Sequence, residues 1–88
     1  MQAIVTVVGS DKVGIVAGVT ATLAELNANI IDISQTILGG AFTMMMAVEL
    51  PENANFAGFK EKLTAKGQEI GVNIHVQNEA IFKAMSEI

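Results

Sequence analysis

The sequence contains no cysteine, tryptophan, tyrosine or arginine. Without cysteine, the chain can form neither a disulfide framework nor a zinc site built on thiolates. Its five basic residues are all lysine, nine residues are acidic, and the net charge is −4. Proteins that bind nucleic acid neutralise phosphates with a basic surface. We therefore expect no direct contact with DNA or RNA.

Targeting segments are also missing from the sequence. Its beginning lacks the basic residues, apolar core and cleavage site of a secretion signal. The longest stretch without charge, residues 33–48, is interrupted by Gly39 and Gly40, and this pattern is typical of a hairpin, not of a membrane-spanning helix. We expect a cytoplasmic protein that does not contact membranes.

Apolar residues, in contrast, are abundant. They make up 51% of the 88 residues, and the mean hydropathy is +0.49. A single domain of this size buries only about two-thirds of the surface that its unfolded chain exposes. The surplus of apolar side chains therefore predicts a homodimer or a larger assembly.

Hydrophobic periodicity predicts one α+β domain. Apolar alternation indicates strands, apolar spacings of three and four indicate helices, and two adjacent glycines predict a tight hairpin turn. The expected order is strand 3–8, helix 15–26, strand 29–38, strand 41–50, helix 56–70 and strand 72–77. This β-α-β-β-α-β order is ferredoxin-like, with an antiparallel four-stranded sheet and two helices on one face. Because the first strand is apolar on both faces, we expect it at the centre of the sheet.

The second strand and the end of the chain give two further expectations. In the second strand we expect Ile31, Ile33 and Ile37 on one face and Ile30 on the other, with Asp32. From about residue 78 a short amphipathic C-terminal helix is predicted, whose apolar residues are Ile81, Phe82, Met85 and Ile88. We divide the chain into a domain at residues 1–77 and this helix at residues 78–88, packed on the same domain or on its dimer partner.

A glycine-containing loop at residues 9–15, with the sequence GSDKVGI, joins the first strand to the first helix. The first N–H groups of a helix have no partner within it, and small side chains leave them accessible to polar or anionic ligand groups. In the second half of the chain the corresponding residues, 51–55, are PENAN. The pattern predicts one binding loop per chain.

With the loop, the Asn29-Ile30 strand start and the order of elements taken together, the sequence resembles ACT domains, the small regulatory modules that bind amino acids in metabolic enzymes and regulators. The resemblance covers residues 1–77 and is closest to the bacterial family of free-standing single ACT domains. The sequence is also similar to the ACT repeats of the glycine-cleavage repressor and to the N-terminal domain of formyltetrahydrofolate deformylase. Asp-Lys-x-Gly-Ile is common at the first turn of these families, and residues 11–15 here are DKVGI.

The resemblance implies a set of ligand-binding residues. In ligand-binding ACT domains the loop of one subunit and the start of the second strand of its neighbour hold an amino acid at a dimer interface. By position, this implicates Asp11, Gly14, Ile15, Asn29 and Ile30. In serine-binding members a histidine lies two residues before the polar residue of the loop, and the residue here is glycine.

Each of these residues also has a structural interpretation. Asp11 can contact a ligand ammonium group or serve as the N-cap of the first helix. Gly14 can allow the helix start to approach a ligand or neighbouring backbone, or it can be a packing glycine under the sheet. Asn29 can hydrogen-bond a ligand or accept left-handed turn geometry.

Metal binding and catalysis have little support in the sequence. Residues 44–46 are three methionines on a predicted strand, where neighbours point to opposite faces, so they indicate packing and not a metal site. His75 has no cysteine or acidic residue within two positions. Ser10 and His75 are the one nucleophile and base worth testing, and no third member stands out. RNA-recognition domains share the fold but need aromatic residues on the sheet, where only Phe42 is expected. We expect no enzyme, metal or cofactor.

The predicted function is a small regulatory module, a homodimer that senses an amino acid or a similar metabolite at the subunit interface. It would report ligand occupancy to a protein partner. The alternative is a constitutive protein-interaction module that binds no small molecule.

Overall fold

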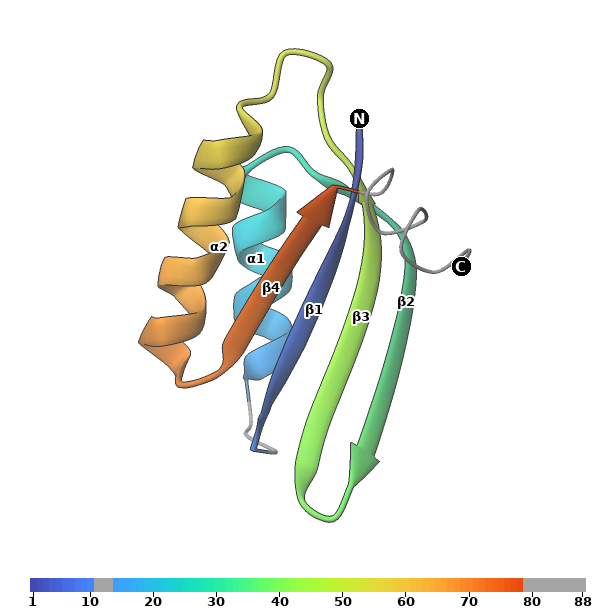
Figure 1. Ribbon diagram of the computed structural model, residues 1–88, viewed down its shortest axis with the longest axis vertical. Helices are drawn as coiled ribbons and strands as arrows, with labels where there is room; N and C mark the ends of the chain where they lie inside the picture. The colour runs from blue at the N-terminus through green and yellow to red at the C-terminus, as the bar shows by residue number, and fades with distance from the viewer. Residues whose placement is uncertain (11–13, 79–88) are drawn as a thin grey trace.

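The computed structural model describes residues 1–10 and 14–78 (Figure 1). Its elements are β1 (Gln2–Ser10), α1 (Ile15–Glu25), β2 (Asn29–Leu38), β3 (Ala41–Glu49), α2 (Phe56–Ile70) and β4 (Asn73–Asn78). The predicted β-α-β-β-α-β order is therefore confirmed. The C-terminal helix expected at residues 78–88 lies, apart from Asn78, outside the described residues. None of the described helices is long and apolar enough to cross a membrane.

The four strands form one antiparallel sheet in the order β2-β3-β1-β4, with β1 at the centre as predicted. Val5 pairs with Met46 of β3 on one side and with Val76 of β4 on the other. Both helices cover one face of the sheet, beside β1 and β4, and β2 lies away from them at the opposite edge (Figure 1).

The core lies between the sheet and the two helices. Alternate residues of each inner strand point into this layer, and each helix contributes buried residues four positions apart, so the sequence periodicity determines what is buried. Met44 and Met46 are fully buried, and Met45 is 41% exposed on the other face. The packing role predicted for the methionines is therefore confirmed for Met44 and Met46. The largest fully buried side chains are Val5, Val7, Val19, Leu23, Met44, Met46, Val48 and Leu63.

The second strand departs from its predicted pattern at a β-bulge. Ile30 pairs with Val48, whereas Asp32 pairs with the next residue of β3, Ala47, so Ile31 is the extra residue. Directly paired residues share a face of the sheet, and Val48 faces the helices. Ile30 therefore lies on the helix-facing side, and the prediction that it shares a face with Asp32 was wrong. One inserted residue reverses the alternation.

The helix ends follow local chemistry. The Oδ1 atom of Asn55 accepts a hydrogen bond from the Gly58 N–H at 3.2 Å and caps α2. Gly71, with φ 78°, ends the same helix. At α1 the N-cap position is held by Gly14, with φ 92° and no side-chain capping bond. The interpretation of Asp11 as the N-cap of α1 was wrong, because α1 begins one residue after Gly14.

Helix α2 lies unusually close to β4 at Gly67. A Cβ atom at this position would lie 2.8 Å from the carbonyl oxygen of Val72 and 2.9 Å from Cγ1 of Ile74. Neither atom can move away easily, because the Val72 oxygen belongs to the backbone and the Ile74 side chain is buried. The absence of a side chain at Gly67 therefore sets the spacing between helix and sheet.

Gly67→Ala should destabilise the protein by about 1–3 kcal/mol through overpacking, although alanine is favoured over glycine within a helix by about 1 kcal/mol. Urea unfolding followed by circular dichroism measures this difference. Gly58→Ala, in the same helix, is the matched control, since its Cβ would approach no atom closer than 3.4 Å. Equal stability of the two variants would contradict the close packing at Gly67.

Candidate functional site

The predicted ligand-binding residues lie at opposite ends of the sheet. Asn29 and Gln2 both pair with Glu49, so the start of β2 is level with the start of β1. The loop follows Ser10, eight residues further along β1, which is about 26 Å away at the rise of a β-strand. Because β1 and β2 run in the same direction (Figure 1), one chain does not bring the loop and Asn29 together.

The loop end of the site contains Gly14 and Ile15, whereas Asp11 lies outside the described residues. Among residues 1–10 and 14–78, no atom lies within 4 Å of a Cβ placed on Gly14, so the interpretation of this glycine as a packing residue under the sheet was wrong. Its φ of 92° is instead a conformation that favours glycine. Ile15 is buried in the core, and it can offer a ligand its backbone N–H but not its side chain. With the N–H groups of the next two residues, it forms the unpaired first turn of α1.

The opposite end of the site contains Asn29 and Ile30. Asn29 is exposed at the start of β2, and Ile30 is half-buried against the core. The left-handed turn before β2 is made by Asn27, with φ 58°. The turn interpretation of Asn29 was therefore wrong, and its side chain remains available to a ligand.

Gly9 has a packing reason of its own. A Cβ atom at Gly9 would lie 2.6 Å from Cγ1 and 3.1 Å from Cβ of Val72. Gly9 is the position that carries histidine in serine-binding relatives. In this chain, Val72, which precedes β4, occupies the space that a side chain at this position would need. A histidine cannot enter here unless Val72 moves, so any ligand of the loop is held without that side chain.

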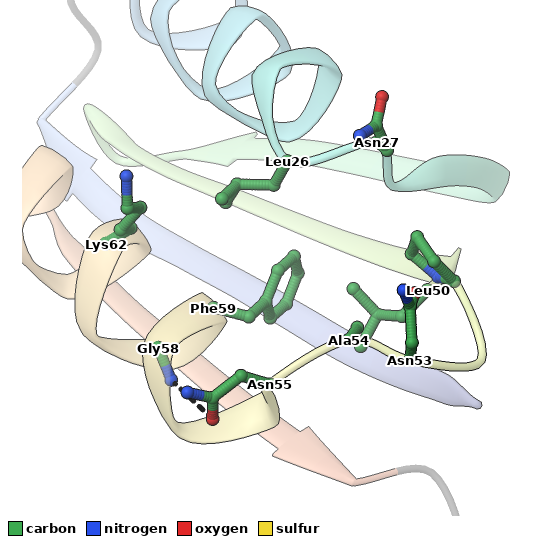
Figure 2. Close-up of a pocket in the computed structure, with 10 residues that line it drawn as sticks. Leu26, Asn27, Leu50, Asn53, Ala54, Asn55, Gly58, Phe59 and Lys62 are labelled. Atoms are coloured by element: carbon green, nitrogen blue, oxygen red, sulfur yellow. Dashed lines mark hydrogen bonds between the residues drawn. The ribbon is translucent and has the colours of Figure 1, made fainter.

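The structure also contains a cleft that the sequence did not point to. It has a volume of about 390 Å³ and lies where the end of α1 meets the loop before α2 (Figure 2). Buried Phe59 and Leu50 form an apolar floor, Asn53 and Asn27 supply carboxamides, and Lys62 supplies a cation. The sequence signal that could have indicated it is the pair of asparagines at positions 53 and 55. The cleft is lined by Leu26, Asn27, Leu50, Pro51, Asn53, Ala54, Asn55, Gly58, Phe59 and Lys62.

The candidate catalytic pair is not assembled. Ser10 pairs with Ala41 at one end of β1, and His75 pairs with Thr6. Ser10 and Thr6, the β1 residue beside His75, are four positions apart, which is about 13 Å along the strand. The side chains of Ser10 and His75 are therefore beyond proton-transfer distance. Within residues 1–10 and 14–78, no group of three histidine, aspartate or glutamate side chains could hold a metal ion.

Comparison with known proteins identifies the family. The family profile described as "ACT domain" matches residues 1–77. This chain belongs to the ACT-domain family. The UPF0237 protein YjhC of Lactococcus lactis is 67% identical to this ACT domain over 88 residues, which is 100% of both chains.

Solved structures agree with this assignment. The structure described as an ACT domain protein from Streptococcus pneumoniae matches with a TM-score of 0.86 and 51% identity, over 93% of both chains. A putative glycine cleavage system transcriptional repressor matches at TM-score 0.77 and 25% identity, over 86% of this chain and 44% of the other. A formyltetrahydrofolate deformylase from Pseudomonas putida KT2440 shares the fold at TM-score 0.80 and 20% identity, over 89% and 29% of the two chains. The resemblance noted in the sequence is confirmed.

An ion pair lies beside the Asn29 end of the ACT domain. The amino group of Met1 lies 2.9 Å from Oε2 of Glu49, the pairing partner of Asn29. The Gln2 amide also donates to Glu49 at 3.4 Å. The hydrogen bond from the Met1 ammonium, and then that from Gln2, lower the pKa of Glu49 below its ordinary value of 4.5.

Glu49→Gln should lower the melting temperature at pH 7 modestly, because the ion pair is exposed to solvent. Folding lowers the pKa of Glu49. The stabilisation of the fold by the Met1–Glu49 ion pair is therefore complete above the unfolded-state pKa of Glu49 and is lost as the pH falls through its folded-state pKa. Melts from pH 7 to pH 3 should therefore show the two proteins converging. Glu52→Gln, with the same change of charge, is the control. A difference that does not vary with pH would contradict the assignment.

Proposed function

We propose that this ACT domain is a regulatory module that binds an amino acid, or a similar small metabolite, between two copies of the chain. The proposal includes the cytoplasmic location expected from the sequence, a protein partner that responds to ligand occupancy, and no direct role in catalysis or nucleic-acid binding. The observation that carries it is the separation of the loop from Asn29 within one chain. A site that uses both needs a second copy.

The free edge of the sheet supports a pairing of copies through β2. This edge strand has ten residues, and its outer N–H and C=O groups can pair with another strand. Ile31, Ile33 and Ile37 are 50%, 41% and 58% exposed, because the helices cover β1 and β4 and not β2 (Figure 1). Long apolar edge strands are rarely left uncovered in stable monomers.

An antiparallel pairing of two β2 edges would also complete the site. Leu38, at the end of β2, is level with Ser10, since both pair with Ala41. A two-fold axis through the middle of β2 would place the partner's strand start at this same end of the combined sheet. The separation between the loop end of β1 and the start of the second strand would fall from about 26 Å to about three strand spacings, roughly 14 Å.

The groups gathered in this way suit a zwitterion. The unpaired N–H groups at the start of α1 favour a carboxylate, and the carboxylate of Asp11 favours an ammonium group. The Asn29 side chain of the second copy can donate and accept hydrogen bonds. A negative residue beside the helix start disfavours a phosphate, so an amino acid fits this set better than a nucleotide does.

The assembly is tested by Ile37→Lys. The side chain is already exposed, so the fold should tolerate lysine, whereas a charge on the edge opposes strand pairing. Light scattering on the purified proteins should give a dimer for the parent chain and a monomer for the variant. Thr64→Lys, on the exposed surface of α2, adds the same charge away from the edge and should remain dimeric. A monomeric parent chain at high micromolar concentration would overturn the proposal.

Ligand binding is tested by thermal melts against a panel of amino acids, followed by circular dichroism because the chain has no tryptophan or tyrosine. A ligand at about a thousand times its dissociation constant adds roughly 4 kcal/mol to stability. We expect one or a few amino acids to raise the melting temperature, and Asn29→Ala to abolish the shift.

The control variant for this experiment is Asn53→Ala, in the cleft of Figure 2. It should keep the full shift, because the cleft is not part of the proposed site. Loss of the shift in Asn53→Ala alone would assign the ligand to the cleft and refute the interface site. A flat response to the whole panel would leave the constitutive protein-interaction module, with β2 as its contact surface.

A further inference from the structure

The face of the sheet opposite the helices is apolar at its centre. Along β1, Ile4 and Val8 point to this side, and Met45 and Ala47 of β3 lie on it as well. Ile4 pairs with Ala47, and Ile4 is only 9% exposed although no described helix covers it. Thr6 lies on this face between Ile4 and Val8 and is polar, and further polar residues surround the centre: Asp32, Ser34, Thr36, Thr43, Asn73, His75 and Gln77.

A hollow marks the same face. Ile4, Met45, Ala47, Asp32, Ser34 and Ile33 line it, and its volume is about 190 Å³. Its lining comes from β1, β3 and the edge strand β2, and four of the six residues are apolar. A hollow of this kind fits a large apolar side chain from a segment that lies across the strands.

The chain itself continues from the edge of this face. Asn78, the last residue of β4, pairs with Ala3, and the residue before it pairs with Ile4. Residues 79–88 therefore begin beside the end of the sheet that carries Ile4 and the hollow.

The sequence of this segment, EAIFKAMSEI, is amphipathic at the period of a helix. Its large apolar residues, at 81, 82, 85 and 88, fall within about 120° of one another at 100° per residue, and the charged residues at 79, 83 and 87 fall on the opposite side. Strand alternation would instead separate Ile81 from Phe82.

The length of the segment also fits the sheet. Ten residues form a helix of about 15 Å. The distance across the sheet from β4 to β2 is three strand spacings, about 14 Å. A helix starting at β4 can therefore cross the open face to the hollow beside β2.

We propose that residues 79–88 form a helix that packs across the open face of their own sheet, with an apolar side chain of the segment in the hollow lined by Ile4 and Met45. The segment then removes from water the apolar centre of a face that would otherwise pair with other molecules. The edge of β2 is left as the exposed apolar surface. This proposal does not depend on whether the chain binds a ligand.

Crosslinking tests whether the segment covers its own sheet. The chain has no cysteine, so Met45→Cys combined with Met85→Cys gives the only two thiols. A short bifunctional maleimide should join them within one chain, which mass spectrometry detects as a single chain carrying one doubly reacted linker. Thr64→Cys with Met85→Cys is the control and should give no internal crosslink, because Thr64 lies on α2, on the other side of the sheet. Chains joined in pairs by the first variant, or no crosslink between reactive thiols, would overturn the proposal.

Methyl NMR of the full chain gives a second test that does not depend on crosslinker geometry. Phe82→Ala should shift the methyl resonances of Ile4 and Met45 and leave those of Leu23, in the core on the helix side, unchanged. Lys83→Ala, on the charged side of the segment, should shift neither Ile4 nor Met45. Unchanged Ile4 and Met45 resonances in Phe82→Ala would refute the packing.

Discussion

The structure depends on the position of β1 at the centre of the sheet. This strand is hydrogen-bonded along both edges, to β3 and to β4, and it is apolar on both faces. Val5 and Val7 anchor the two helices on one face, and Ile4 forms the apolar centre of the other. In a domain this small the core is limited, so one strand that contributes to both faces supplies much of the available burial.

The direction of β1 also decides where a ligand site can form. The loop leaves the strand at one end, and β2, which runs in the same direction, begins at the other end. Hydrogen-bonded register fixes both positions, and no local rearrangement changes them. The residues proposed to bind the ligand are thus separated in the single chain, and the exposed apolar edge of β2 is the contact through which we propose that two chains bring them together.

Local chemistry made much of the fold predictable. The hairpin at Gly39 and Gly40, the cap at Asn55 and the exit at Gly71 depend on residues that are adjacent in sequence. The bulge at Ile31 was not predictable in the same way, because the two strands must be aligned before an extra residue becomes visible. Asn27, and not Asn29, takes the left-handed conformation because it directly follows Leu26, the C-cap of α1, where glycine or asparagine is favoured.

The sequence by itself determined the order of elements, the central first strand, the family and the buried stripes, because periodicity and turn chemistry act over a few residues. Only the tertiary structure decided which residues face which surface of β2, how closely α2 approaches β4 at Gly67, and that Val72 fills the space beside Gly9. It also decided that the loop and Asn29 lie at opposite ends of one sheet. These features arise from contacts between segments distant in the chain, which no local pattern encodes.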